Sequence, residues 1–398
     1  MSLPSLYLKS QTDRRLRRGH LWIYSNEVDV QRSPLKMFSP GQQVRVLNKR
    51  DELMGIALIN PASLICARLI SCDETQLDAG LLRSRFTHAL SLREQAFSQP
   101  YYRLIFGDSD LLPGLVVDRF GDYLVVQIAS AGMEVVRELV VEQLVALLQP
   151  TGVLLANDHS ARELEGLARY TEVAYGEVPD EVELIENDTK FVAPVASGQK
   201  TGWFFDHRVG RAQMRQWVAG KRVLDVFSYI GGWGVQAATA GAAQVVCVDA
   251  SAKAIAGVEA NARLNGVQDR VSGRQGKAID VMKALLAEGA KFDVVVLDPP
   301  AFIKRRKDQK AGEAAYRHIN ELGLKLLADG GLLVSASCSM HLAADTLTDI
   351  VRACAQKAGR DARLIHFSGQ GPDHPVHPAI IETNYLKAVF TRVFNRDH

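Results

Sequence analysis

Between residues 222 and 337 the sequence alternates short, almost wholly apolar runs with longer segments of helical spacing. Strands that are apolar on both faces and alternate with helices are typical of a parallel sheet covered by helices on each side. We therefore expect a doubly wound α/β domain, in which Ser251 caps a helix that stops at Asn265 and Gly266. The five apolar runs are RVLDVFS, QVVCVDA, RVSGRQG, FDVVVLD and GLLVSAS.

Two further domains are expected before this one. Short apolar runs with Ser-Pro-Gly and Asn-Pro breakers in the first 75 residues indicate a small, mostly β module. Beyond it, a helical segment, two strand-like runs, a second helical segment and the strand GVLLAND indicate an α+β domain. Near the C-terminus, ARLIHFSG and YLKAVFTRVF are expected to be terminal strands. The predicted domains are 1–75, 76–190 and 191–398.

The net charge of +2 conceals an uneven distribution of basic residues. Residues 1–50 hold ten Lys or Arg against three acids, and a second basic run, KRRKDQK, begins at Lys304. A lone charge cluster is usually a solvated surface. Two such clusters, one of them beside a suspected active-site loop, favour a polyanionic substrate such as a nucleic acid.

The cysteines and the apolar runs argue against several other classes of protein. The five cysteines form no Cys-x-x-Cys pair, so we expect neither a disulfide scaffold nor a metal site. No apolar run approaches the roughly 20 residues of a membrane span. The first 20 residues lack the apolar block of a secretory signal. We expect a cytoplasmic protein that acts without a membrane or a metal.

A cofactor site is expected where the first two strands of the α/β domain end. The stretch VLDVFSYIGGWG ends a strand at Asp225 and continues into a turn with Gly231, Gly232 and Gly234, which opens a helix. The spacing is not the Gly-x-Gly-x-x-Gly of nicotinamide cofactors. Asp249 ends the second strand, where a carboxylate faces the ribose hydroxyls of a bound nucleoside. Together with the Asp-Pro-Pro loop at the fourth strand, this pattern predicts an S-adenosylmethionine site of a class I methyltransferase.

Adenine recognition is expected to depart from the common arrangement. The third strand is followed by RQGKAID, so Lys277 stands where an acid often accepts from the adenine amino group. Asp280 is expected on the following helix, which leaves backbone groups near Lys277 and Ala278 to bind the base. The residues expected to border the cofactor here are Asp225, Phe227, Ser228, Tyr229, Gly231, Gly232, Asp249, Ala250, Ser251, Lys277, Ala278 and Asp298.

The residues that follow the fourth and fifth expected strands indicate which atom is methylated. VVVLDPPAF breaks from a strand at Asp298, as in enzymes that methylate exocyclic amino groups. In LLVSASCSMH, however, Cys338 follows the fifth strand, at the sheet edge where ligands bind. A thiolate that adds to carbon 6 of a pyrimidine makes carbon 5 nucleophilic, a covalent step that nitrogen methylation does not need. Cys338 therefore favours carbon, with Asp298 at the pyrimidine edge assisting protonation of ring nitrogen 3. A buried apolar role is the alternative for this cysteine.

The chain resembles, essentially from end to end, the RNA cytosine carbon-5 methyltransferases typified by ribosomal RNA large subunit methyltransferase I. RRLRRGHLWIYSNEV looks like the opening of that family's PUA module, an RNA-binding β barrel, and SGQKTGWFFDHR resembles its signature before the methyltransferase core. LDVFSYIGGWG, VDAS, LDPPAF and SCS follow. The resemblance implies a Rossmann-like methyltransferase domain, a cytosine of 23S rRNA as the substrate, and Cys338 as the nucleophile. It also implies that Gln199, Lys200, Thr201, Asp206 and Arg208 border the cofactor.

Related RNA cytosine methyltransferases also carry a cysteine in the fourth-strand motif, and this sequence has none there, so Cys338 would act alone. Phe302 is expected either to stack on a flipped base or to fill the core. Two rival functions stay open: methylation of an exocyclic amino group or of uracil carbon 5, and a non-catalytic RNA-binding assembly factor. A homodimer also stays open. The residues expected to contact RNA are Arg14, Arg15, Arg17, Arg18, His20, Lys304, Arg305 and Arg306.

Overall fold

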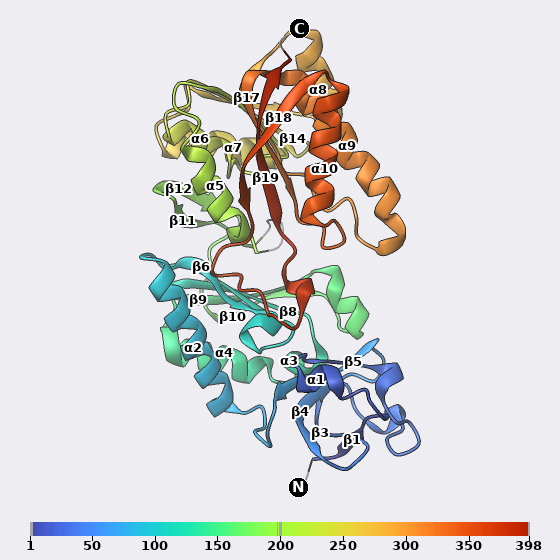
Figure 1. The fold of residues 1–398 in the computed structure, drawn as a ribbon. Helices are drawn as coiled ribbons and strands as arrows, with labels where there is room; N and C mark the ends of the chain where they lie inside the picture. The colour runs from blue at the N-terminus through green and yellow to red at the C-terminus, as the bar shows by residue number, and fades with distance from the viewer. Residues whose placement is uncertain (1–2, 197, 199–200, 397–398) are drawn as a thin grey trace. The chain divides into compact units, whose positions relative to one another are not determined.

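The computed structural model describes residues 3–196, 198 and 201–396. The chain divides into two compact units, each built from more than one segment. The first unit comprises residues 1–182, 194–205 and 372–383, and the second comprises residues 183–193, 206–371 and 384–398. The boundaries of the three predicted domains stay predictions. Figure 1 labels the helices and strands of both units.

The first unit begins with a five-stranded sheet in the order β1-β3-β4-β5-β2. An isolated bridge between Leu8 and Val28 joins the segments that follow the two edge strands, so the sheet curls into part of a barrel. The strand Trp22–Tyr24 was not predicted, because three residues are too few to show an alternation of apolar and polar residues. The helix that carries the basic run was not predicted either. The elements are β1 (Ser5–Tyr7), α1 (Arg14–Arg17), β2 (Trp22–Tyr24), β3 (Gln42–Leu47), β4 (Leu53–Ile59) and β5 (Ile65–Ser71).

A second five-stranded sheet follows in the same unit, in the order β10-β9-β8-β7-β6. The predicted helix at 78–98 is confirmed as α2, and Asp78 caps it by accepting from the backbone N–H of Leu81. The prediction of two strand-like runs was wrong, since Gly121, with a φ of 63°, turns the second run into two strands. The elements are α2 (Ala79–Ala96), β6 (Tyr101–Phe106), β7 (Leu115–Phe120), β8 (Tyr123–Ile128), α3 (Ala131–Val135), α4 (Arg137–Leu148), β9 (Gly152–Asn157) and β10 (Tyr170–Gly176).

The second unit contains a seven-stranded sheet in the order β15-β14-β13-β16-β17-β19-β18. Its first five strands in that order pair in parallel, and β19 pairs antiparallel with both β17 and β18. The expected doubly wound α/β architecture and the two terminal strands are therefore confirmed. The strands are β13 (Arg222–Val226), β14 (Gln244–Asp249), β15 (Val271–Gln275), β16 (Phe292–Leu297), β17 (Leu327–Ser337), β18 (Arg360–Ser368) and β19 (Lys387–Asn395).

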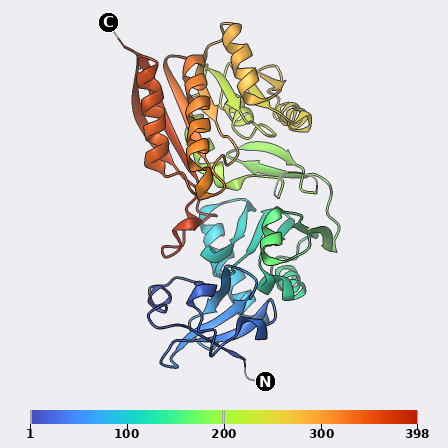
Figure 2. The same ribbon diagram turned by 90° about the vertical axis from the view of Figure 1, so that its right-hand side faces the viewer.

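Helices cover this sheet (Figure 2), and α9 packs against both α8 and α10. The predicted helix cap is confirmed, because Ser251 accepts from the backbone N–H of Ala254, and Asn265 ends the helix. A hairpin that the sequence analysis missed precedes the sheet. These elements are β11 (Val182–Glu186), β12 (Thr189–Ala193), α5 (Arg208–Arg215), α6 (Gly234–Thr239), α7 (Ala252–Leu264), α8 (Ala278–Ala287), α9 (Gln309–Leu326) and α10 (Ala344–Lys357).

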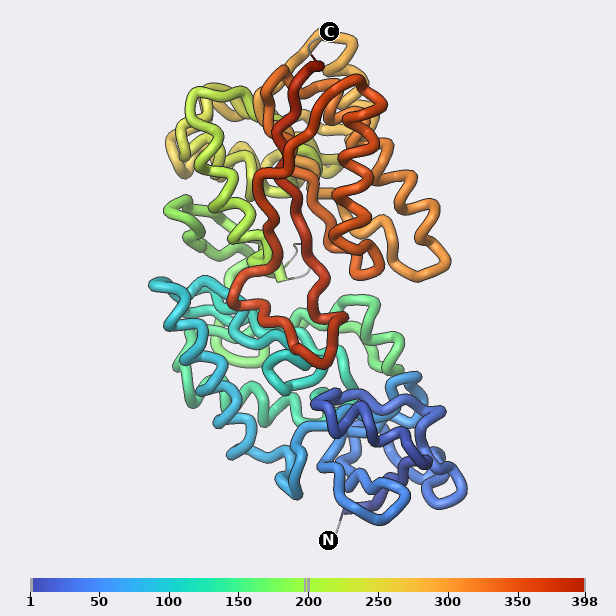
Figure 3. The backbone as a smooth tube through the Cα atoms, in the orientation of Figure 1, coloured from blue at the N-terminus to red at the C-terminus, as the bar shows by residue number. Residues whose placement is uncertain are grey.

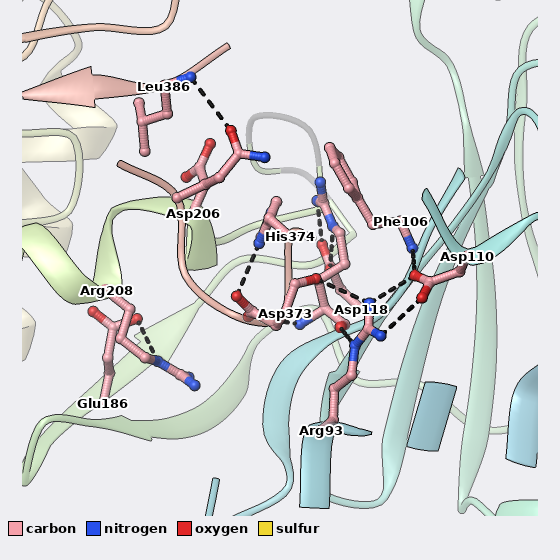
Figure 4. Close-up of polar contacts among 12 residues, drawn as sticks. Arg93, Phe106, Asp110, Asp118, Glu186, Asp206, Arg208, Asp373, His374 and Leu386 are labelled. Carbon is pink, nitrogen blue, oxygen red and sulfur yellow. Dashed lines mark hydrogen bonds and ion pairs between the residues drawn. The ribbon is translucent and has the colours of Figure 1, made fainter. Parts of the chain in front are cut away.

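The chain leaves the second unit after Gly371, contributes residues 372–383 to the first unit, and returns in β19 (Figure 3). In the first unit this segment meets Arg93, whose side chain is wholly buried and pairs with both oxygens of Asp110 (Figure 4). Arg93 also donates to the carbonyl oxygen of Asp373, and the Asp373 carboxylate accepts from the backbone N–H of Arg103. The last part of the sequence thus completes hydrogen bonds of the first unit.

Candidate functional site

The turn after β13 is held by the end of the neighbouring strand. The backbone N–H groups of Phe227 and Ser228 donate to the carbonyl oxygen of Val248, and that of Tyr229 donates to Asp249 Oδ2. Phe227 and Tyr229 have φ values of 69° and 48°, a left-handed conformation that costs about 1–2 kcal/mol for a residue with a side chain. Such conformations persist where surrounding bonds enforce them, and they are common at ligand sites.

The glycines behind this turn are required by close packing. Gly231 has a φ of 89°, and a Cβ added to Gly234 would lie 2.3 Å from Cys247 Sγ. Asp225 Oδ2 accepts from the Gly234 N–H at 2.8 Å, while its buried Oδ1 has no partner in the part of the chain that the structure describes. Burial raises the pKa of Asp225 to about 7. The turn is thus a rigid backbone cradle of the kind that S-adenosylmethionine requires.

The end of β14 opens towards solvent beside that cradle. Asp249 Oδ1 accepts from the Ser251 N–H at 2.9 Å, and Asp249 Oδ2 accepts from Tyr229 at 3.0 Å. Each carboxylate oxygen keeps a second lone pair. The partly exposed Asp249 and the exposed Ala250 and Ser251 therefore fit the ribose end of a nucleoside.

The region proposed for adenine lies at the start of α8. Lys277 is the exposed residue that precedes the helix, and Ala278 is its first residue. Asp280 lies in the first turn of α8, as expected. The first N–H groups of a helix have no partner within the helix, so the backbone here can bind a base edge.

Asp298, directly after β16, is held by two side chains. His207 Nε2 lies 3.1 Å from Asp298 Oδ1, and Trp233 Nε1 donates to Asp298 Oδ2 at 3.0 Å. Burial disfavours ionisation of Asp298, but His207 and Trp233 outweigh it and hold the pKa of the carboxyl below its usual range. Burial likewise opposes the charged form of His207, and Asp298 raises the pKa of the imidazole nonetheless. Asp298 is therefore an ionised acceptor in a fixed orientation.

Cys338 follows β17, the strand next to β16, as the sequence analysis expected. Leu297 and Ser335 are partners across the two strands, so Asp298 and Cys338 leave the sheet at the same edge. The Cys338 side chain is partly exposed. The serines on both sides of it are buried, and the Tyr316 hydroxyl lies 2.7 Å from Ser337 Oγ and 2.9 Å from Ser339 Oγ. Cys338 thus projects from a loop whose flanks are fixed.

Phe302 lies between this loop and the core. Its ring centroid is 4.9 Å from that of Tyr316 and 6.4 Å from that of Phe227. The residue after it, Ile303, donates its N–H to Ser339 Oγ at 3.2 Å. These contacts favour the core role for Phe302, and they tie the loop after Asp298 to the loop after Cys338.

The segment SGQKTGWFFDHR contributes to both units. Gln199 and Lys200 lie outside the described residues. Thr201 belongs to the first unit, where it is fully buried and donates to Asp118 Oδ2 at 2.5 Å, so its place at the cofactor stays a prediction. In the second unit, Asp206 accepts from the Tyr385 hydroxyl at 2.5 Å, and Arg208 Nε lies 3.5 Å from Glu186 Oε2 (Figure 4).

The predicted RNA-contact residues differ in their availability. Arg15 and Arg17 form ion pairs with Glu27 and with Asp13 and Glu52, and Arg305 pairs with Asp308. His20 accepts from the backbone N–H of Trp22. The remaining predicted residues are exposed and have no acidic partner among the described residues; they are Arg14, Arg18, Lys304 and Arg306.

Four side chains of this site were not predicted from the sequence: His207, Trp233, Tyr316 and Lys387. His207 and Trp233 lie inside motifs that had been singled out, GWFFDHR and GGWG, and their spacing to Asp298 carries no signal. Tyr316 belongs to a helical segment in which an aromatic residue predicts only core packing. Lys387 begins a strand and carries no motif at all.

Two family models together match most of the chain. A family model for S-adenosylmethionine-dependent methyltransferases matches residues 140–392, and one for PUA-like domains matches residues 6–72. The chain is 36% identical to ribosomal RNA large subunit methyltransferase I of Aeromonas hydrophila, over 98% of this chain and 99% of that protein. It is 33% identical to the protein of the same name from Vibrio cholerae, over 98% and 99%.

Among solved structures, the chain resembles a methyltransferase complexed with SAH, with a TM-score of 0.84 and 21% identity, over 98% of this chain and all of that one. A SAM-dependent methyltransferase from Streptococcus mutans gives a TM-score of 0.83 at 21% identity with the same coverage. These likenesses bear on the fold alone, which they match along the whole chain.

The described residues hold neither a metal-binding cluster nor a membrane-spanning helix. In residues 3–196, 198 and 201–396, no group of three or more His, Cys, Asp or Glu side chains is arranged to hold a metal ion. Over the same residues, no helix is long and apolar enough to cross a membrane.

Proposed function

The chain belongs to the ribosomal RNA large subunit methyltransferase I family, and from this premise we propose that it methylates carbon 5 of a cytosine in 23S rRNA through a covalent adduct of Cys338. It is an S-adenosylmethionine-dependent methyltransferase whose substrate is large-subunit ribosomal RNA. We propose the target base, the target atom and the roles of the individual residues.

S-adenosylmethionine supplies an electrophilic methyl group when bound at the carboxyl edge of the sheet. In the proposal, the Cys338 thiolate adds to carbon 6 of the cytosine, which makes carbon 5 nucleophilic towards that methyl group. Loss of the carbon 5 proton to a base, followed by cleavage of the carbon–sulfur bond, restores the aromatic ring and frees the cysteine. Asp298, ionised beside His207, accepts from the exocyclic amino group. As the thiolate adds, the protonated His207–Asp298 pair gives a proton to ring nitrogen 3, and the pair takes that proton back when the carbon–sulfur bond breaks.

The single observation that carries the proposal is that Cys338 and Asp298 leave adjacent strands at the same sheet edge, on loops held by fixed hydrogen bonds. An amino-group methyltransferase needs the acceptor at Asp298. It does not need a partly exposed cysteine beside it. The rigid loop around Cys338 is accordingly best explained by a covalent step.

The RNA part of the proposal rests on charge. Arg14, Arg18, Lys304 and Arg306 are exposed cations that are available to phosphates, whereas Arg15, Arg17 and Arg305 are already engaged by acids. Because ribosomal RNA is the substrate, we also propose a cytoplasmic location. Sedimentation of the purified protein measures whether it forms a homodimer.

The test is nucleoside mass spectrometry of 23S rRNA from cells that lack the protein. The proposal expects one 5-methylcytosine to disappear, to return with the wild-type gene, and not to return with Cys338→Ala. An unchanged 5-methylcytosine level would falsify the target. Loss of a methylated amino group or of 5-methyluridine instead would assign one of the rival activities, and an unaltered nucleoside profile would leave the assembly-factor function.

A further inference from the structure

A buried lysine begins β19, directly across from the strand that carries Cys338. Ser337, the residue before Cys338, is the antiparallel partner of Lys387. The Lys387 side chain is 8% exposed. Its Nζ donates to the carbonyl oxygens of Ser339 at 2.6 Å and Leu342 at 2.7 Å. Lys387 therefore binds the main chain immediately after the cysteine.

We propose that Lys387 is a positioning residue that fixes the Cys338 loop and, through its ammonium charge, stabilises the Cys338 thiolate. The inference rests on the proposed function, in which that thiolate attacks the pyrimidine. An ordinary cysteine is mostly a thiol at neutral pH, so a nucleophilic cysteine needs a nearby cation or base.

The hydrogen bonds explain how a charged lysine survives in this place. A buried ammonium is costly unless its protons are bonded, and two carbonyl oxygens accept them here. Neither acceptor carries a formal charge, so the positive charge of Lys387 is not cancelled by them. A thiolate at Cys338 is the anion that would neutralise it.

The electrostatics agree with this geometry. Burial lowers the pKa of Lys387 to about 8, and the charge of Cys338 works in the opposite direction and raises it. Coupling between two titrating groups is reciprocal, so a Lys387 ammonium that is stabilised by a Cys338 thiolate stabilises that thiolate in turn. Tyr316 also faces the loop, and burial raises the pKa of its hydroxyl, which therefore stays neutral.

The loop thus has two anchors with different tasks. Tyr316 binds the side chains of Ser337 and Ser339, while Lys387 binds the backbone after Cys338. Only the second anchor brings charge. A purely structural role for Lys387 would need the hydrogen bonds alone, and this difference can be measured.

The test is the pH dependence of iodoacetamide alkylation at Cys338. Cys72→Ser serves as the background, because Cys72 is exposed while Cys66, Cys247 and Cys354 are buried. In that background, Lys387→Gln keeps a hydrogen-bond donor without the charge, Lys387→Arg keeps the charge, and Lys387→Met removes both. Mass spectrometry of the Cys338 peptide gives the rate.

The proposal expects alkylation at pH 7 to fall about tenfold in Lys387→Gln and Lys387→Met, which corresponds to one pKa unit, and to stay within about threefold of the background in Lys387→Arg. The matched control is Lys291→Gln, since Lys291 Nζ also donates to a backbone carbonyl, that of Lys325, at the opposite end of β16. The control should alkylate as the background does. An unchanged thiol pKa in a folded Lys387→Gln protein would overturn the charge role.

A second measurement needs no change at Lys387. In Cys338→Ser, NMR titration of carbon-13-labelled lysine should give a lower pKa for Lys387 than in the wild-type protein, and an equal value would also overturn the proposal. Both titrations are independent of methyl transfer. If Cys338→Ala kept full 5-methylcytosine formation, the proposed function would fail while the thiol and lysine titrations still decided the coupling.

Discussion

The two halves of the candidate site are built by different means. After β13 and β14, the cofactor half is shaped by backbone: left-handed residues at Phe227 and Tyr229, a glycine cradle, and N–H groups bound by Val248 and Asp249. After β16 and β17, the chemical half is shaped by side chains from remote segments, such as His207 and Lys387. A backbone-built half can be recognised from a short motif, whereas a side-chain-built half depends on residues that the fold alone brings together.

The largest effect is expected for Cys338→Ala, which changes the chemical half of the site and leaves the cofactor half as it is. We expect methyl transfer to fall at least about a thousandfold, because alanine cannot form the covalent bond, while cofactor affinity stays unchanged. Single-turnover transfer to 23S rRNA and calorimetric titration with S-adenosylmethionine measure the two halves separately. Residual transfer within tenfold of the wild type would contradict the covalent step.

The converse change is Gly234→Ala in the cofactor half. The new Cβ would lie 2.3 Å from Cys247 Sγ, so the cradle must shift, and we expect about 1–3 kcal/mol of lost stability with weakened cofactor binding. Denaturant unfolding and calorimetry measure the two effects. Gly369→Ala is the control, since a Cβ there meets nothing closer than 3.6 Å. Equal cofactor affinity in both variants would argue against a rigid cradle.

His207→Gln is expected to change how stability and methyl transfer depend on pH. The pKa of His207 is raised by Asp298 despite burial, so the stabilisation that depends on His207 being charged is fully present below about pH 6.5 and is lost as the pH rises through the raised value. The pKa of Asp298 is lowered, so the stabilisation is also lost as the pH falls through that lower value. Glutamine donates to Asp298 without charge, so we expect the transfer rate to fall about tenfold and the loss at high pH to disappear, while the loss at low pH remains because Asp298 still titrates.

Unfolding and transfer measured across the pH range check the His207 prediction. His318→Gln, an exposed histidine on α9, provides the matched control and should keep the wild-type profile. A His207→Gln profile that overlays the wild type would show that the pair has no role in transfer.

The smallest effect is expected on RNA affinity, from two residues outside both halves of the site. Arg14→Ala with Arg18→Ala removes two exposed cations, and we expect RNA affinity to fall severalfold and the salt slope to decrease by about two, with no change in cofactor affinity. Arg352→Ala, an exposed arginine on α10, is the control. RNA binding is measured at several salt concentrations, and an unaltered slope would exclude Arg14 and Arg18 from the interface.

The sequence predicted the second unit better than the first for a physical reason. Doubly apolar strands and the Ser251 cap are local signals, and both were found as expected. The β2 strand was missed because it is only three residues long, and the split between β7 and β8 was missed because a single glycine makes it. Asp298 and Cys338 could be placed on neighbouring strands from topology. Their partners could not, since no pattern in the sequence connects position 207 with 298, or 387 with 338.

The segment 372–383 has a consequence for how the protein is made. The backbone N–H of Arg103 is bonded by Asp373, although the two residues are 270 positions apart. During synthesis, a nascent chain that ends before residue 372 cannot complete the first unit, whatever the order in which its sheets form. Domains commonly fold one after another from the N-terminus as they emerge from the ribosome. Here the first unit is finished by a segment that is translated 270 positions after Arg103, one of the residues to which it bonds.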